Sequence, residues 1–254
     1  NIIFNSLPLS SYKKGIEQPL FYKNKTIVFN GEIFNYKRLN KYCNSDVDYL
    51  KRTLFKYKGD VLKLYKESLK WDGFWSIAII EDKNIFFFTD PLGKKQLYYS
   101  KEGISSEIKG LEEKGYYQSY TEKNFGTFNT NFVNIKRVLP GKLYKYFIRN
   151  NLAEQILGLN YIFKETESDL YNIIDQSVKD RLENRYDDVS LLLSGGLDSN
   201  IVLHHLLKYK KNIDIVSIEN KEKDTVNKIQ NDYSLSINYI KDYYTKNDLN
   251  KAIY

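Results

Sequence analysis

The chain has 254 residues, of which 42% are hydrophobic and 28% are charged, and its formal net charge is +7. This length can supply apolar cores for two ordinary domains. No run reaches the roughly 18 uninterrupted apolar residues of a membrane span, and no charged-then-apolar signal sequence opens the chain, so we expect a cytoplasmic protein without membrane partners. Because the lysines are mixed with acidic residues along the whole chain, nucleic acid is disfavoured as a partner.

The cysteine and methionine contents are also informative. Cys43 is the one cysteine, so it cannot close an internal disulfide, and no group of Cys and His has the spacing of a zinc site. We interpret Cys43 as a packed or incidental residue. The sequence contains no methionine and begins with Asn1, which we interpret as the start of a fragment.

The first half of the sequence predicts an α+β domain. Apolar or alternating runs separated by turn residues predict strands at 26–30, 74–80, 85–89, 96–100 and 143–148. Asp46 is expected to cap a helix that extends to about Tyr57, and a further helix is expected at Val61–Ser68. Closely spaced strands with two intervening helices indicate a layered α+β domain over residues 1–150.

The pattern of predicted elements changes after an expected linker at 151–164. An amphipathic helix is predicted at 165–183, with an apolar stripe formed by Leu170, Ile173, Ile174, Val178 and Leu182. The remaining segments alternate between strands at 189–193, 213–218 and 236–240 and helices at 197–209 and 224–232. This alternation predicts an α/β domain with a parallel sheet over residues 165–254, as in doubly wound folds.

A glycine-containing loop, Ser194-Gly195-Gly196-Leu197-Asp198-Ser199, lies between an expected strand and an expected helix. Free backbone amides and the helix dipole favour an anion at this place. The two glycines allow phosphates to approach the backbone closely, and both serine hydroxyls can donate hydrogen bonds to them. Asp198 would repel a bare phosphate, which indicates a Mg²⁺ ion between the two groups. The loop lacks the lysine of a Walker motif, which disfavours γ-phosphate transfer.

This loop resembles the signature of ATP pyrophosphatases, which hold the pyrophosphate that leaves ATP and which form adenylates. By position in that resemblance, Leu192 and Ile218 would flank the adenine, although both would equally suit core packing. His204 and His205 follow on the helix, where surface or helix-packing roles are favoured over catalysis. The lysines in 208–211 are interpreted as a solvated helix end.

A second resemblance involves the first half of the chain. The segment Phe29-Asn30-Gly31-Glu32-Ile33-Phe34-Asn35, followed by Leu39, resembles the Asn-Gly-Glu-Ile-Tyr-Asn segment of class II glutamine amidotransferases. Four further segments occur in the family's order: Ser45-Asp46, Asp72-Gly73-Phe74, Asp90-Pro91-Leu92-Gly93-Lys94 with Leu97-Tyr98-Tyr99, and Ser106-Glu107-Ile108-Lys109 with Leu111. Together with the loop at 194–199, they make nearly all of residues 1–250 similar to glutamine-hydrolysing asparagine synthetases.

The resemblance implies an Ntn-hydrolase-like αββα sandwich followed by a parallel-sheet domain of the adenine nucleotide α-hydrolase-like (PP-loop) type. Glutamine hydrolysis in the first domain would supply ammonia to an aspartyl adenylate that the second domain makes from ATP with Mg²⁺. The Asn30 side chain and the Gly31 amide would form the oxyanion hole, and Glu32 and Asp46 would hold the glutamine. Asp198 would bind the metal. The implied partners are glutamine, aspartate and ATP, and a homo-oligomer is left open.

Three departures from the family leave alternatives open. The family's nucleophile is a cysteine at the mature N-terminus, whereas Asn1 aligns inside the domain, and residues 5–9 lack the family's arginine for the glutamine carboxylate. The chain also ends at Tyr254, before further acidic and lysine residues of the family. The missing arginine favours a glutaminase-deficient relative that uses another amine, as β-lactam synthetases and lasso-peptide cyclases do. The retained Asn30, Gly31 and Asp46 favour glutamine use, and a non-catalytic scaffold is the third alternative.

Overall fold

The computed structural model describes residues 18–111, 130, 132, 134–158, 169–182, 189–209, 212–219 and 222–241. The chain divides into two compact units, Asn1–Glu165 and Thr166–Tyr254, which are treated separately below. None of the helices in these ranges has the length and apolar character needed to cross a membrane.

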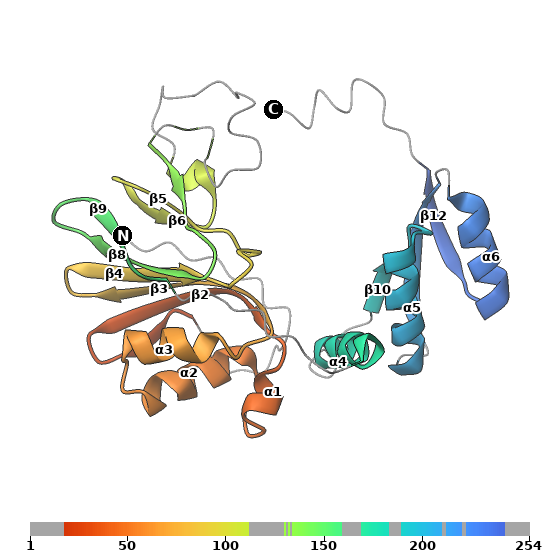
Figure 1. The fold of residues 1–254 in the computed structure, drawn as a ribbon, viewed down its shortest axis with the longest axis horizontal. Coiled ribbons are helices and arrows are strands. Elements are labelled where there is room, and N and C mark those ends of the chain that lie inside the picture. The colour runs from red at the N-terminus through yellow and green to blue at the C-terminus, as the bar shows by residue number, and fades with distance from the viewer. Residues whose placement is uncertain are drawn as a thin grey trace. The chain divides into compact units, whose positions relative to one another are not determined.

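The first unit is built on a six-stranded sheet in the order β1-β2-β3-β4-β8-β9, in which all neighbouring strands are antiparallel (Figure 1). Its strands are β1 (Leu20–Tyr22), β2 (Lys25–Ile33), β3 (Gly73–Glu81), β4 (Asn84–Thr89), β8 (Lys142–Phe147) and β9 (Leu152–Gly158). A smaller sheet, in the order β6-β5-β7, consists of β5 (Tyr98–Ser100), β6 (Gly103–Ser105) and β7 (Lys136–Arg137). The helical elements are α1 (Tyr36–Leu39), α2 (Asp46–Lys56), α3 (Val61–Ser68) and a 3₁₀ turn, Ile108–Gly110.

Side chains on the two faces of the large sheet form two separate cores. On one face, Ile27 and Ile77 pack with Leu50 of α2 and Leu64 of α3. On the opposite face, residues such as Phe87 and Tyr144 pack against Leu97 and Tyr99 of the β5 segment. The layered α+β prediction for this unit is therefore confirmed, with helix, sheet and sheet layers among its described residues (Figure 1). A second helical layer, which an αββα sandwich requires, is not among them.

Two strand boundaries differ from the sequence prediction. Strand β2 continues through Ile33 instead of ending at residue 30, because Asn30, Gly31 and Glu32 pair with Ser76, Trp75 and Phe74 of β3. Strand β9 lies inside the range 151–164, which was expected to be a linker. Its pairing with β8 makes it the edge strand of the large sheet, so the expected start of the linker at 151 is wrong. Residues 159–164 lie outside the described ranges.

The start of α2 also corrects a sequence expectation. Ser45, and not Asp46, is the N-cap, because the Ser45 hydroxyl accepts a hydrogen bond from the Asp48 amide at 3.0 Å. Asp46 is the first helical residue, and its carboxylate instead accepts hydrogen bonds from the amides of Ile33 and Val47. The side chain thus joins the beginning of α2 to the end of β2.

The second unit contains three parallel strands in the order β10-β11-β12, which confirms the predicted parallel pairing. Its elements are α4 (Leu170–Leu182), β10 (Val189–Leu192), α5 (Leu197–Tyr209), β11 (Ile213–Glu219), α6 (Lys223–Tyr233) and β12 (Ile237–Lys241). Leu203 of α5 and Val226 of α6 pack with Ile215 of β11 in one core. Because strand side chains alternate, the opposite face carries Leu192, Ile218 and Ile240, which this core does not include.

Helix α4 differs from its expected apolar stripe. Val178 is buried, but Leu170 and Ile173 are exposed, and the described helix begins at Leu170 instead of 165. Residues 165–168 and 183 lie outside the described ranges. The apolar periodicity therefore predicted more buried residues than this helix has. The helix contacts α5 through a cluster of polar side chains.

Asp90 is a buried carboxylate that organises the segment after β4. Its Oδ1 atom accepts hydrogen bonds from the amides of Leu92 and Lys94, both at 3.0 Å. Its Oδ2 atom accepts from the amides of Trp75 at 3.3 Å and Lys95 at 2.9 Å. Each carboxylate oxygen therefore satisfies two backbone donors, and the residue is only 1% exposed.

We expect Asp90→Asn to destabilise the first unit by at least about 2 kcal/mol, because either orientation of the new amide leaves two buried N–H groups without an acceptor. Asp82→Asn, in an exposed turn, is the matched control and should change stability by less than about 1 kcal/mol. Both tryptophans, Trp71 and Trp75, are buried in this unit, so denaturant unfolding followed by tryptophan fluorescence measures it. Equal stability of the two variants would contradict the assigned role of Asp90.

Candidate functional site

The predicted glutamine site begins where β2 and β3 approach very closely. Gly31 has φ 141° and Gly73 has φ 155°. A Cβ atom on Gly31 would lie 2.0 Å from the Phe74 carbonyl oxygen, and one on Gly73 would lie 2.0 Å from the Glu32 carbonyl oxygen. No side chain fits at either position. The sequence motif Asn-Gly-Glu therefore needs its glycine for backbone contact between the strands.

Asn30 and Glu32 flank Gly31, and alternation along the strand directs both side chains to one face of the sheet. Phe74 lies directly across from Glu32, so its ring belongs to the same face. The Phe74 ring also packs edge-on against Phe34, with 5.5 Å between the ring centroids. Residues predicted from the motif and an aromatic wall are thus brought together at one end of β2 and β3.

Asp46 adds a second carboxylate near this end of β2. Its Oδ2 atom accepts a hydrogen bond from the Ile33 amide at 3.3 Å, and its Oδ1 atom accepts one from the Val47 amide at 2.8 Å. Burial raises the pKa of Asp46 to about 6, and the negative charge of Glu32 acts in the same direction. A bound ammonium group would favour the ionised form of Asp46, which makes this residue suited to an amino group.

Asn35 fixes the segments on either side of this site. Its side-chain nitrogen donates to the Lys70 carbonyl at 3.0 Å, and its side-chain oxygen accepts from the Asp72 amide at 2.9 Å. The Phe34 amide also donates to the Asp72 carbonyl at 2.7 Å. These bonds attach the end of β2 to the beginning of β3. The sequence motif includes Asn35 but does not reveal this role.

Lys95 lies against this aromatic wall, and no sequence motif singled it out. Its ammonium nitrogen lies 5.8 Å from the centroid of the Phe74 ring, and its backbone amide donates to Asp90. A signal was available in the motif Asp90-Pro91-Leu92-Gly93-Lys94, because Lys95 is the next residue. Only the folded chain shows that this lysine reaches the residue opposite Glu32.

The predicted phosphate loop lies at the junction of β10 and α5 in the second unit. The hydroxyls of Ser194 and Ser199 are 3.0 Å apart, and the Ser199 hydroxyl also donates to the Gly196 carbonyl at 3.0 Å. The Gly196 amide donates to the Ser194 hydroxyl at 3.3 Å. Gly195 has φ 87°, and a Cβ atom there would lie 2.8 Å from Cβ of Glu222. The loop is thus closed by its own hydroxyls and packed against the start of α6.

This arrangement fits a polyphosphate, because Ser194 and Asp198 are exposed and α5 is a full-length helix of 13 residues. Asp198 lies in the first turn of α5. Among the described residues, no group of three or more His, Cys, Asp or Glu side chains could hold a metal ion. A Mg²⁺ ion at Asp198 would therefore take further ligands from phosphate oxygens and water, as Mg²⁺ commonly does.

Leu192 and Ile218, expected to flank an adenine or to pack in the core, are both on the sheet face that α5 and α6 do not cover. Leu192 is 60% exposed and Ile218 is 37% exposed. The core-packing interpretation is therefore wrong for both residues. They lie near the carboxyl ends of two adjacent parallel strands, β10 and β11, and β10 leads into the loop.

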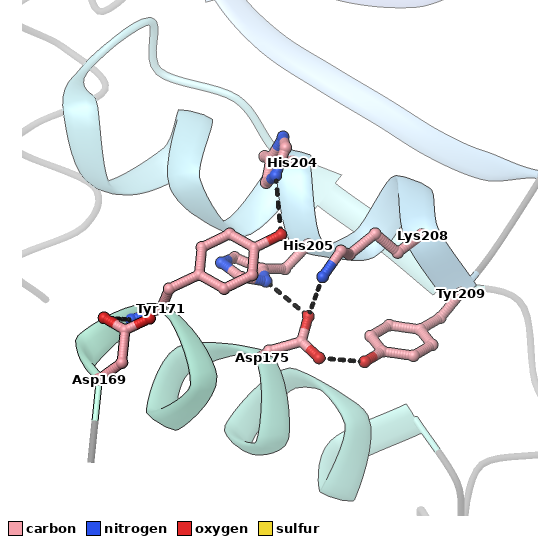
Figure 2. A network of polar contacts seen from close by, with 7 residues as sticks. All are labelled: Asp169, Tyr171, Asp175, His204, His205, Lys208 and Tyr209. Carbon is pink, nitrogen blue, oxygen red and sulfur yellow. Dashed lines mark hydrogen bonds and ion pairs between the residues drawn. The ribbon is translucent and has the colours of Figure 1, made fainter.

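The two histidines belong to a polar cluster between α4 and α5 (Figure 2). The Asp175 carboxylate contacts His205 Nδ1 and Lys208 Nζ, each at 2.8 Å, and accepts a hydrogen bond from the Tyr209 hydroxyl. The bond from Lys208 is the main reason that the pKa of Asp175 is held below its usual range, and Asp175 in turn raises the pKa of Lys208.

This cluster decides two sequence interpretations. His205 is 2% exposed, which confirms its helix-packing role, while His204 lies on the outer side with its Nε2 atom 3.4 Å from the Tyr171 hydroxyl (Figure 2). Lys208 is exposed in the last turn of α5, as expected for a solvated helix end, and its ammonium group also contacts the Asp175 carboxylate. Residues 210 and 211 lie outside the described ranges. The cluster attaches α4 to the helix that carries the phosphate loop.

The raised pKa of Asp46 predicts a pH-dependent stability that Asp46→Asn should remove. The folded pKa is about 6, whereas an unfolded Asp titrates near 3.9, so the folded state binds more protons between about pH 4 and 6. Stability must therefore fall as pH rises through this window. We expect the unfolding free energy of the wild type minus that of Asp46→Asn to fall by roughly 2 to 3 kcal/mol between pH 4 and 7. Tryptophan fluorescence during denaturation measures it, and a constant difference would contradict the raised pKa.

Comparison with known proteins gives the first unit a family. Residues 7–113 match the family described as glutamine amidotransferase domain. "Putative asparagine synthetase (glutamine-hydrolyzing) 1" of Methanocaldococcus jannaschii is 27% identical over 206 residues, which are 73% of this chain and 36% of that protein. "Putative asparagine synthetase (glutamine-hydrolyzing) 2" of the same organism is 34% identical over 96 residues, 34% of this chain and 18% of that protein.

The chain thus spans about a third or less of the length of these curated relatives. A solved structure titled as the allosteric regulatory enzyme of purine biosynthesis has a TM-score of 0.40 and 12% identity, and covers 89% of this chain and 63% of that one. The match at 7–113, which includes Asn30, Gly31, Glu32 and Asp46, shows that the chain carries a glutamine amidotransferase domain and is related to proteins named as glutamine-hydrolysing asparagine synthetases.

Proposed function

We propose that the protein acts in an asparagine synthetase-like, ATP-dependent amidotransfer, in which glutamine-derived ammonia attacks an aspartyl adenylate to give asparagine, AMP and pyrophosphate. The observation that carries this proposal is the second unit. The chain joins a glutamine amidotransferase domain to a parallel sheet in which the turn from β10 to α5 presents two serine hydroxyls at a helix amino end. The names of the two relatives are consistent with this combination.

In the first unit, the proposed chemistry is hydrolysis of the glutamine amide. The Asn30 side chain and the Gly31 amide would donate hydrogen bonds to the oxyanion of the tetrahedral intermediate. Asp46 and Glu32 would hold the glutamine, and burial of Asp46 strengthens its interaction with an ammonium group. No nucleophile is assigned among the described residues.

In the second unit, the proposed chemistry is adenylation. The aspartate carboxylate would attack the α-phosphorus of ATP, and pyrophosphate would leave while the loop Ser194–Ser199 holds it with Mg²⁺ at Asp198. The exposed side chains of Leu192 and Ile218 would flank the adenine, near the carboxyl ends of the adjacent strands β10 and β11. Ammonia would then attack the acyl carbon, and AMP would leave with the electron pair of the broken acyl–oxygen bond.

Exchange of labelled pyrophosphate into ATP tests the second unit independently of glutamine. We expect exchange by the full chain to require aspartate and Mg²⁺, and Asp198→Ala to lower its rate at least about 100-fold through loss of metal-assisted charge stabilisation. Asp232→Ala, at an exposed position of α6, is the matched control and should retain the wild-type rate. Full exchange by Asp198→Ala would contradict the assigned site.

The same measurement separates the alternatives. Exchange that depends on a carboxylate other than aspartate would favour a relative that forms a different amide, of the β-lactam synthetase or lasso cyclase type. If the wild-type chain shows no pyrophosphate exchange with any carboxylate, the scaffold alternative is the one that remains. Release of ammonia from glutamine, measured in the same preparation, decides whether the first unit retains glutaminase chemistry.

A further inference from the structure

Glutamine carries a positive amino group and a negative carboxylate on the same carbon atom, so a specific site must bind both charges. The candidate site in the first unit has two carboxylates, those of Glu32 and Asp46, which suit the amino group. Two carboxylates alone would repel the glutamine carboxylate, since like charges in a partly buried site interact strongly. A cation near Glu32 and Asp46 would offset this repulsion.

Lys95 supplies a cation at this place. Its ammonium nitrogen lies 5.8 Å from the centroid of the Phe74 ring, and Phe74 is the cross-strand partner of Glu32. The side chain is half-buried, and no ion pair engages it among the residues that the structure describes. An ammonium group held by an aromatic face keeps N–H donors for a ligand, because the ring accepts it without using a carboxylate.

The backbone at Lys95 is also fixed in place. Its amide donates to Oδ2 of Asp90 at 2.9 Å, and the same oxygen accepts from the amide of Trp75, the residue after Phe74. The start of the Lys95 side chain is therefore attached to β3 beside the candidate site. A lysine fixed in this way loses less conformational freedom on binding a ligand than a fully mobile surface lysine.

The lengths are compatible with one bound glutamine. Asn30 and Glu32 lie on the same strand face, about 7 Å apart along β2. This is comparable with the length of an extended glutamine from its amide nitrogen to its α-carboxylate. With the amide at Asn30, the α-carboxylate would lie near Glu32 and Phe74, whose ring the Lys95 ammonium group contacts.

We propose that the Lys95 ammonium group binds the α-carboxylate of glutamine and so selects a free amino acid as the substrate of this site. The inference rests on the proposed glutamine chemistry of the first unit. Lys95 would then be the partner of the glutamine carboxylate. The resemblance assigns this role to an arginine, which residues 5–9 do not contain.

Calorimetric titration of the full chain with two ligands tests this assignment. The ligands are L-glutamine and 4-aminobutanamide, which is glutamine without its α-carboxylate. We expect Lys95→Gln to weaken glutamine binding about 10-fold or more, as loss of a charge-assisted hydrogen bond does, and to change 4-aminobutanamide binding by less than about twofold. Lys95→Arg, which keeps the charge, should bind glutamine within about tenfold of the wild type.

Lys94→Gln is the matched control, because Lys94 is exposed and its amide also donates to Asp90. It should bind both ligands as the wild type does. Unchanged glutamine binding by Lys95→Gln would overturn the assignment while leaving the glutamine site in place, and so would equal weakening of both ligands. A wild-type chain that binds neither ligand would instead overturn the proposed glutamine chemistry, and the role of Lys95 with it.

Discussion

A buried carboxylate, Asp90, determines how the segments around the first candidate site are held together. Its two oxygens accept hydrogen bonds from amides on β3 and in the following loop, so strand and loop cannot move independently without exposing N–H groups in a dry interior. One of these amides belongs to Trp75, the residue after Phe74, and another belongs to Lys95. The position of the Lys95 ammonium group relative to the Phe74 ring therefore depends on the Asp90 carboxylate, which is buried too deeply to contact a substrate.

The close approach of β2 and β3 acts together with this constraint. Glycine at 31 and 73 lets the two backbones meet where any Cβ atom would overlap a carbonyl oxygen. Asn35 then ties the strand ends together through the backbone of Lys70 and Asp72. Asn30, Glu32 and Phe74 thus project from a part of the sheet with little freedom to relax. This rigidity is suited to a site that must stabilise a short-lived oxyanion, because the donors need no reorganisation during the reaction.

Much of this arrangement could be predicted from the sequence, and the limits have physical causes. Alternation and periodicity identify strands β2, β3 and β4 and helices α2, α5 and α6, because each buries one regular face. Strand β9 is missed because an edge strand with mostly exposed side chains has a weak apolar pattern. Ser45 is the cap because Asp46 is drawn to the Ile33 amide, a contact 13 residues away that no local pattern encodes. Lys95 is missed for the same reason, since its contact with Phe74 joins segments that are far apart in the sequence.

The two candidate sites differ in the hydrogen bonds that their polar groups make before a ligand binds. In the first unit, the buried side chains of Asn35, Asp46 and Asp90 are hydrogen-bonded to backbone groups, so a ligand would bind to a framework that is already held together. In the second unit, the hydroxyls of Ser194 and Ser199 are bonded to each other and to the loop backbone, on an exposed surface. A phosphate oxygen that enters the loop must replace the bond between the two hydroxyls. Because one hydrogen bond is exchanged for a charge-assisted one, the replacement is favourable for an anion and unfavourable for a neutral group. On the proposed function, the loop would thus discriminate by charge, and the apolar face at Leu192 and Ile218 would distinguish what the phosphate is attached to.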